Sequence, residues 1–136
     1  MLPNRSMPSC SVIPVLGYPD VQEAIDWLCR TFGFALRLQI ADHRAQLKVG
    51  DGCLVITRRD PSEKACGCAV MVRVEDLDLH YERALAFGAQ SLATPEDHPY
   101  GERQYSVEDF AGHLWTFSQS IADVSPEDWG GSVGQL

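Results

Sequence analysis

The feature of this sequence that most constrains its fold is an order of elements that occurs twice. In residues 12–57, an apolar strand-like run is followed by a helical pattern and then by three more strand-like runs. The same order returns in residues 68–119, after a polar stretch at residues 58–67 that contains a proline and is typical of a linker. Such repetition indicates an internal duplication. We therefore predict an α+β fold, in which two tandem βαβββ modules form a curved mixed sheet around a cavity.

Two aspartates mark the expected starts of the helices. Asp20 and Asp76 each precede a pattern with helical spacing, and aspartate often caps a helix N-terminus. Gly33 and Gly88 follow these patterns and are natural stops. The apolar stripes expected to cover the sheets are Val21, Ala24, Ile25 and Leu28 in the first helix, and Leu77, Tyr81, Ala84 and Leu85 in the second. The strand-like runs are residues 12–18, 34–40, 44–49, 53–57, 69–74, 89–94, 102–108 and 113–118.

Length and composition bound the rest of the organisation. A chain of 136 residues, 45% of them hydrophobic, is long enough for one well-buried domain, which we place at residues 12–119. Residues 1–11 are predicted to be a mobile N-terminal arm, and residues 120–136 a C-terminal tail with a helical turn near Pro126. Because no apolar run has the length of a membrane span and the first residues lack the core of a secretory signal, we expect a cytoplasmic protein.

The five cysteines are spread over helix-like, strand-like and loop contexts, which favours reduced thiols over a disulfide framework. Cys66 and Cys68 are the only close pair. A metal or redox role for this pair requires further cysteines or histidines at a recognisable spacing, and the sequence offers none. We interpret the pair as part of a loop that leads into a strand.

The net charge of −8 and the lack of a basic patch argue against a nucleic-acid partner. The charge is unevenly distributed: residues 1–74 carry a net charge of +2 and residues 75–136 a net charge of −10. An acidic half of this kind suits a cationic ligand or partner, and it also suits a solvated surface that keeps the protein soluble. The sequence leaves both interpretations open.

The stretch from Pro99 to Gln119, P-Y-G-E-R-Q-Y-S-V-E-D-F-A-G-H-L-W-T-F-S-Q, has the pattern of a β-hairpin. Over residues 12–119 the chain resembles the vicinal oxygen chelate superfamily of glyoxalases, bleomycin resistance proteins and extradiol dioxygenases. The hairpin is similar to the G-D/E-R and D-P-x-G-H-x-W segment of its small bacterial glyoxalase-like members, with Phe110 where proline is usual. The resemblance implies the predicted fold, but one scaffold hosts many chemistries.

Metal-dependent members of that superfamily hold the metal with His, Glu or Gln from the first and last strands of each module. The matching positions here are Ile13, Ile56 or its neighbour Thr57, Ala69 and Thr116. None of these side chains is a good ligand for a divalent transition metal. The histidines also share no ligand spacing on one element; they are His43, His80, His98 and His113. We therefore expect no metal and no other cofactor.

The resemblance also indicates which side chains face a cavity. The candidate ligand-binding residues are Arg103, Tyr105, Thr116, Ser118, Leu114, Ile13, Val15, Ile56, Met71 and Tyr100. Because side chains alternate along residues 102–108, the inward set is either Arg103, Tyr105 and Val107 or Glu102, Gln104 and Ser106. We favour the first set, since a guanidinium beside a tyrosine suits an anionic or aromatic group. A structural ion pair of Arg103 is the alternative.

Three functions are compatible with these features. The first is a metal-independent small-molecule binding protein of the glyoxalase/bleomycin-resistance type, which sequesters a drug or metabolite. The second is a lyase or isomerase, or a dioxygenase-related enzyme, in which Arg103, Tyr105 or His98 replaces the metal; its catalytic residues are unknown. The third is a dimeric interaction module. For all three we expect a homodimer that does not act on nucleic acid or membranes.

Overall fold

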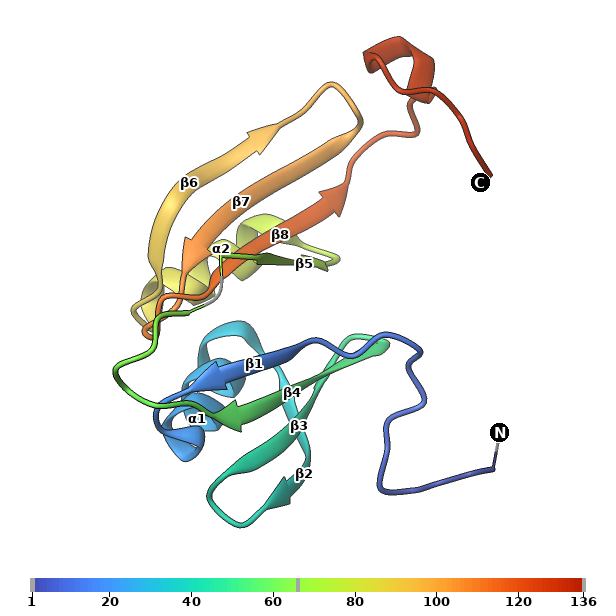
Figure 1. Ribbon diagram of the computed structural model, residues 1–136. Coiled ribbons are helices and arrows are strands. Elements are labelled where there is room, and N and C mark those ends of the chain that lie inside the picture. Colours follow the sequence, from blue (N-terminus) through green and yellow to red (C-terminus); the bar gives the residue numbers. More distant parts are fainter. Residues whose placement is uncertain (1, 66, 136) are drawn as a thin grey trace. The chain divides into compact units, whose positions relative to one another are not determined.

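The computed structural model describes residues 2–65 and 67–135. The chain divides into two compact units, one ending at residue 66 and the other beginning at residue 67. Each unit contains a four-stranded sheet and a helix (Figure 1). The described residues include no helix that is long and apolar enough to cross a membrane.

The first unit follows the predicted order of elements. These are β1 (Val15–Tyr18), α1 (Val21–Phe32), β2 (Ala35–Ile40), β3 (Arg44–Val49) and β4 (Gly52–Arg58). The strands form one sheet, here called sheet A, in the order β1-β4-β3-β2. In this sheet β1 runs parallel to β4, and the other neighbours are antiparallel.

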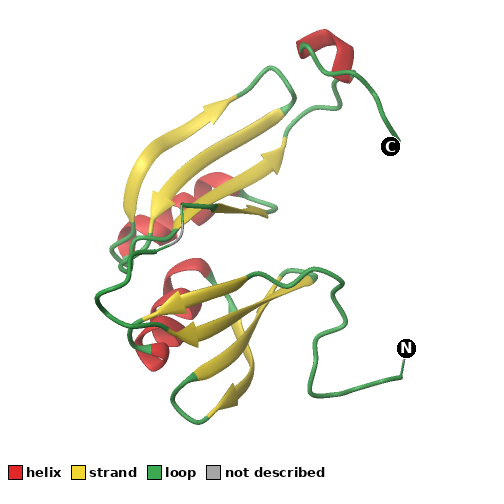
Figure 2. Ribbon diagram, in the orientation of Figure 1, coloured by secondary structure: helices red, strands yellow, loops and turns green. Residues whose placement is uncertain are grey.

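The second unit repeats this arrangement (Figure 2). Its elements are β5 (Ala69–Arg73), α2 (Leu77–Ala86), β6 (Gln90–Asp97), β7 (Glu102–Glu108), β8 (Leu114–Ser120) and the 3-10 helix η1 (Pro126–Trp129). Its sheet, sheet B, has the order β5-β8-β7-β6, again with one parallel pair, β5 and β8. Identical strand orders confirm the prediction of two βαβββ modules.

Both helices begin as predicted. The carboxylate of Asp20 accepts a hydrogen bond from the backbone N–H of Glu23 at 3.0 Å, and that of Asp76 accepts one from Leu79 at 3.1 Å. α1 ends at Gly33, which has a φ of 79° that favours glycine. Local sequence signals therefore set these helix ends.

The cores lie between each sheet and its helix. In sheet A, Leu54 and Ile56 are buried on the side that packs against α1. In sheet B, Trp115 and Phe117 are fully buried on the side of α2. At about 1.5–3 kcal/mol for each large apolar side chain, such layers are the main stabilising contribution to each unit.

The expected stripe of α2 holds only in part. Leu77 and Ala84 are fully buried, but the side chain of Leu85 is 41% exposed. The apolar face of α2 is therefore narrower than the sequence spacing indicated, because the helix turns Leu85 toward its flank.

The register of sheet B decides which side chains of β7 face α2. Tyr105 pairs with Phe117 and Val107 pairs with Trp115, and all four are buried. Since side chains alternate across a strand, Glu102, Gln104 and Ser106 occupy the other side. The parity that we favoured for this strand is wrong, and the alternative set lies on the side away from α2.

Arg103 shares the α2 side with Tyr105. Its guanidinium forms ion pairs with Asp78 of α2, at 3.0 Å, and with Asp97 of β6, at 2.9 Å. These carboxylates raise the pKa of Arg103, and the largest cause is the hydrogen bond that Arg103 donates to Asp97. Arg103 thus has the structural ion-pair role, and it does not face a cavity.

The same argument corrects Ile56 in sheet A. Ile56 pairs with Leu16 and Ala45, and all three belong to the core beneath α1. The prediction that Ile56 faces a cavity is wrong, because it alternates with Val55, whose side chain lies on the other side of β4. Val15, the partner of Val55 in the sheet, is 53% exposed on that other side.

Residues 5–10 lie on the side of sheet A that faces away from α1. The guanidinium of Arg37, on β2, donates hydrogen bonds to the backbone carbonyls of Arg5, at 2.9 Å, and Met7, at 3.1 Å. These contacts seat part of the expected N-terminal arm on sheet A, and the mobility of residues 1–11 stays a prediction. We call residues 5–10 the N-terminal segment.

The cysteines differ from the expectation of reduced thiols. Cys10, Cys29 and Cys53 are free, whereas Cys68 is disulfide-bonded. Cys66, the other half of the close pair in the sequence, lies outside the described residues.

Candidate functional site

The side of sheet B away from α2, here called its open face, brings together side chains from three strands. The register places Met71 opposite Thr116 and Arg73 opposite Ser118 on the parallel strands β5 and β8. On the antiparallel side, Gln104 lies opposite Ser118 and Ser106 opposite Thr116. This face is therefore a continuous surface of small hydroxyls, longer polar side chains and a few apolar groups.

A pocket of about 350 Å³ lies on this face. Its apolar surface comes from Met71 on β5, Tyr100 in the β6–β7 turn and Trp129 on η1. Tyr100 makes an edge contact with Trp129, with ring centroids 5.5 Å apart, and stacks on His98 at 5.1 Å. Aromatic pairs of this kind are favourable beyond their buried area, so they hold the C-terminal residues as one wall of the pocket. The complete lining is Met71, Arg73, Tyr100, Glu102, Gln104, Ser118 and Trp129.

A chain of hydrogen bonds orients the polar side of the pocket. The Tyr100 hydroxyl donates to Gln104 Oε1 at 3.1 Å, and Gln104 Nε2 donates to Ser118 Oγ at 3.0 Å. Ser118 Oγ in turn donates to Glu102 Oε1 at 2.8 Å. Hydrogen bonds from Ser120 and then Ser118 lower the pKa of Glu102, so its carboxylate is the charged end of this chain.

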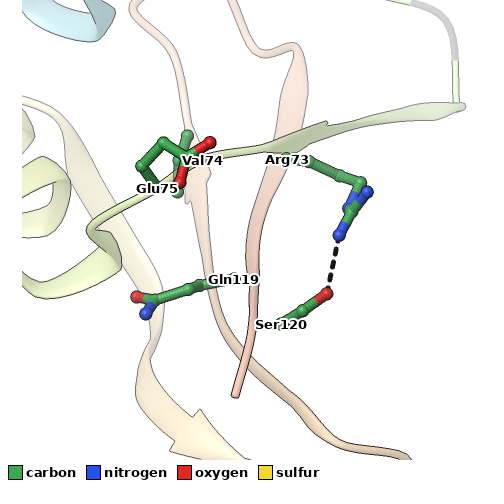
Figure 3. Close-up of a pocket in the computed structure, with 5 residues that line it drawn as sticks. All are labelled: Arg73, Val74, Glu75, Gln119 and Ser120. Atoms are coloured by element: carbon green, nitrogen blue, oxygen red, sulfur yellow. Dashed lines mark hydrogen bonds between the residues drawn. The ribbon is translucent and has the colours of Figure 1, made fainter. Parts of the chain in front are cut away.

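Arg73 lines both this pocket and a smaller polar one of about 180 Å³, whose lining residues Figure 3 shows. Its Nη2 donates a hydrogen bond to Ser120 Oγ at 2.7 Å. Within the described part of the chain, Arg73 has no carboxylate within ion-pair distance, in contrast to Arg103 and Arg58. A guanidinium has five donors, so Arg73 retains donors for an anionic or carbonyl group. The smaller pocket is lined by Arg73, Val74, Glu75, Gln119 and Ser120.

Several predicted site residues meet on the open face of sheet B. Met71, Ser118 and Tyr100 line the pocket. Thr116 and Leu114 lie on the same face, where Thr116 Oγ1 shares a hydrogen bond with Ser106 Oγ at 3.0 Å. These five are brought together because β5 and β8 are neighbours and the β6–β7 turn reaches the same face.

Other predicted site residues do not belong to the open face of sheet B. Arg103 and Tyr105 are on the α2 side of sheet B, as described above. Ile13, Val15 and Ile56 belong to the first unit, where Ile13 is half-buried just before β1.

Four residues of the pocket are not among the candidate ligand-binding residues predicted from the sequence: Arg73, Glu102, Gln104 and Trp129. Glu102 and Gln104 belong to the alternative inward-facing set of residues 102–108. The sequence does not decide between the two sets, and only the pairing of β7 with β8 shows that this set lies on the open face. Arg73 ends a strand of branched apolar residues, so its alternation with Val72 was a usable signal. Trp129 follows a Ser-Pro-Glu-Asp helix start, but nothing local indicates that it reaches Tyr100.

The positions that match the metal ligands of metal-dependent superfamily members do not carry metal-binding side chains. Ala69 and Thr116 lie on the open face of sheet B and offer a methyl group and a hydroxyl that is already bonded to Ser106. Ile13 and Thr57 are in the other unit and offer at most one hydroxyl. Divalent transition metals require imidazole, thiolate or carboxylate ligands. No group of three such side chains occurs among residues 2–65 and 67–135.

The duplicated topology agrees with a sequence comparison. Residues 12–117 match the profile of the Glyoxalase/Bleomycin resistance protein/Dioxygenase superfamily. The chain belongs to this superfamily. The match covers both modules of this glyoxalase-superfamily protein, from the residues before β1 to the middle of β8.

Solved structures agree with this assignment. TioX from Micromonospora sp. ML1 is 37% identical, with a TM-score of 0.69 over 82% of this chain and 100% of that one. FosX from Listeria monocytogenes, a genomically encoded fosfomycin resistance protein solved with Mn(II) and sulfate, has a TM-score of 0.67 over 90% of this chain and 96% of that one. Its identity is 17%, so its similarity to this glyoxalase-superfamily chain concerns the fold alone.

A relative from Mycobacterium bovis, an uncharacterized protein, is 32% identical over 59 residues. The match covers 43% of this chain and 39% of the relative, so it spans well under half of the length of that protein.

Proposed function

We propose that this protein binds a small molecule, without a metal, in the pocket on the open face of sheet B. The observation that carries the proposal is the composition of the pocket. Met71, Tyr100 and Trp129 give an apolar surface, and an ordered polar strip from Gln104 to Glu102 lies beside it. Small-molecule sites combine an apolar concave surface with a few placed polar groups in this way, and the volume of about 350 Å³ is within their usual range.

The chemistry of the pocket favours a ligand with a flat apolar group and one anionic group. The rings of Tyr100 and Trp129 suit the flat group. Arg73 donates to the neutral hydroxyl of Ser120 and has further donors for a carboxylate. Glu102 already accepts a hydrogen bond from Ser118, so it is the weaker anchor for a cationic ligand.

Three probes with one ring system and different charges test this proposal. These are 2-naphthoate, 2-naphthol and 2-naphthylmethylammonium, with binding measured by isothermal titration calorimetry. We expect 2-naphthoate to bind at least about 10-fold more tightly than the other two, which corresponds to about 1.4 kcal/mol. Trp129→Ala should weaken all three probes, whereas Arg73→Met should weaken 2-naphthoate alone.

Trp27→Phe, a change on α1 in the other unit, is the matched control and should leave binding unchanged. The pocket is not the binding site if all three probes have dissociation constants above about 1 mM (roughly −4 kcal/mol). The same conclusion follows if the Trp129→Ala variant binds the probes as tightly as the unmodified protein. Titrations repeated after dialysis against EDTA test the metal-independent part. Loss of binding that Zn²⁺, Mn²⁺ or Ni²⁺ restores would contradict it.

The homodimer and the cytoplasmic location stay predictions. Light scattering during size-exclusion chromatography tests the first, and a monomeric mass at micromolar concentration would contradict it.

A further inference from the structure

The N-terminal segment is seated on sheet A by contacts with a nearly buried side chain. Gln46 on β3 is only 6% exposed, and its two amide atoms are both used. Its Nε2 donates to the backbone carbonyl of Ser6 at 2.9 Å, and its Oε1 accepts from Arg37 Nη1 at 2.5 Å. Pro8, in the middle of the segment, is buried. With the two carbonyls held by Arg37, the segment is tied to the sheet at three consecutive residues.

These contacts bring two cysteines together that are distant in the sequence. Cys10 ends the segment, and Cys53 lies near the start of β4. The two thiols form a hydrogen bond with each other, and the Cys10 sulfur lies 3.9 Å from the backbone carbonyl of Asp51 in the turn before β4. Both are free thiols and both are partly exposed. A small-molecule oxidant therefore has access to a prepositioned pair.

We propose that Cys10 and Cys53 form a redox-responsive disulfide that fixes the N-terminal segment on the face of sheet A opposite α1. In the oxidised protein a covalent bond fixes the segment on this face, and in the reduced protein it is held by non-covalent contacts such as those of Arg37 and Gln46. The pair is thus a modification site that controls how firmly the N-terminal segment is held on sheet A.

The oxidant for this step is a low-molecular-weight disulfide. The thiolate of one cysteine attacks it, releases one small thiol and forms a mixed disulfide. The thiolate of the second cysteine then attacks the protein sulfur of the mixed disulfide and displaces the second small thiol. The protein gives up two electrons and two protons, and the small disulfide is reduced to two thiols.

The surroundings of Cys53 set the pH at which exchange is efficient. Burial and the neighbouring Cys10 thiol raise the pKa of Cys53, and the positive charges of Arg37 on β2 and Lys48 on β3 act in the opposite direction. Since the thiolate is the reactive form, disulfide formation should be faster at pH 8.5 than at pH 7.

The test equilibrates the whole protein with glutathione and glutathione disulfide at defined ratios, followed by acid quench, alkylation and tryptic mass spectrometry. We expect a disulfide between the peptides 6–30 and 49–58. Peptide 6–30 also contains Cys29, so Cys29→Ser is run in parallel and should form the same link. Cys10→Ser should abolish it and leave Cys53 glutathionylated.

Two further variants test whether the contacts that hold the N-terminal segment on sheet A are what bring Cys10 and Cys53 together. Arg37→Met removes the donors to the segment and should lower the equilibrium constant for disulfide formation at least about 10-fold, because Cys10 is then no longer held near Cys53. Arg58→Met, an arginine on the same sheet whose partner is Asp42, is the matched control and should have no effect. Circular dichroism verifies that both variants are folded.

Hydrogen exchange of the unmodified sequence supplies a readout that needs no variant. Oxidation should slow exchange at the amides of Ser6 and Met7 relative to the reduced protein. The proposal is overturned if Cys10 and Cys53 accumulate only as separate mixed disulfides with glutathione, if Arg37→Met and Arg58→Met behave alike, or if oxidation leaves exchange in residues 5–10 unchanged.

Discussion

The two modules have the same strand order, and they differ in what lies on the side of each sheet away from its helix. In sheet A that side is crossed by the N-terminal segment, which Arg37 and Gln46 hold through backbone carbonyls. In sheet B the corresponding side carries a pocket, and the C-terminal residues contribute only one wall, through Trp129. An internal duplication thus preserves the helix-facing core and leaves the opposite faces free to acquire separate roles.

The modules differ also in the turn before their last strand. In sheet B the buried Asp109 accepts hydrogen bonds from the backbone of Ala111 and His113 and from Trp115 Nε1, each at 3.0 Å. In sheet A the turn relies on Gly50, with a φ of 58°, and Asp51 there is exposed. Both turns contain a glycine with positive φ, Gly50 and Gly112, and the turn of sheet B is in addition tied to the core by the carboxylate of Asp109.

The largest effect on stability is expected from removing the carboxylate of Asp109, which distinguishes the two turns. Asp109→Ala leaves the buried Trp115 N–H and two backbone donors without their acceptor and should lower the free energy of unfolding by about 3–5 kcal/mol. Asp51→Ala, the matched change in the other module, should alter it by less than about 0.5 kcal/mol. Urea unfolding at 25 °C measures both, and similar losses would show that the two turns are equivalent.

A smaller effect is expected from the ion pairs that flank the sheets. Arg103→Met removes two ion pairs in the second module, and Arg58→Met removes a single, more exposed pair with Asp42 in the first. The thermal midpoint should fall more for Arg103→Met, and the difference should shrink in 1 M NaCl because salt screens exposed charges. Binding of 2-naphthoate should be unaffected by Arg103→Met. A loss of affinity in this variant would indicate that Arg103 takes part in the binding site.

The smallest effect concerns pH. The pKa of Glu102 in the folded protein lies below its ordinary value of 4.5, so its ionised form contributes stability above about pH 4.5 that is lost as the pH falls further. Glu102→Gln should therefore make the thermal midpoint less sensitive to pH between about 5 and 3. The thermal midpoint is measured against pH by differential scanning calorimetry. If its slope is the same in Glu102→Gln as in the unmodified protein, the hydroxyls of Ser118 and Ser120 do not favour the ionised carboxylate.

Much of the fold follows from local signals in the sequence. The capping aspartates Asp20 and Asp76, the stop at Gly33 and the alternation around Trp115 act within a few residues of themselves. Each predicts an element without knowledge of its neighbours, and the repetition of the pattern then predicts the duplication. The bounds of β3 and β7 agree with the structure for this reason.

The sequence did not decide which side of its strand each residue of the candidate site faces. Arg103 and Glu102 are adjacent in an alternating strand, and a shift of one residue exchanges them between pocket and core. Only the pairing of Tyr105 with Phe117, under α2, selects one parity. The same holds for Ile56, which a shift of one residue along β4 would place on the side of sheet A away from α1.

By itself, the sequence determined the two βαβββ modules and their helix ends, because capping, glycine turns and periodicity are short-range effects. Tertiary structure decided which side chains meet, because strand pairing and the docking of the terminal segments join residues that are distant in the chain. Tertiary structure therefore put Arg73 and Trp129 in the lining of one pocket, Arg103 beside Asp78 and Cys10 beside Cys53. The two halves of the protein share a fold, and these long-range contacts are what distinguish them.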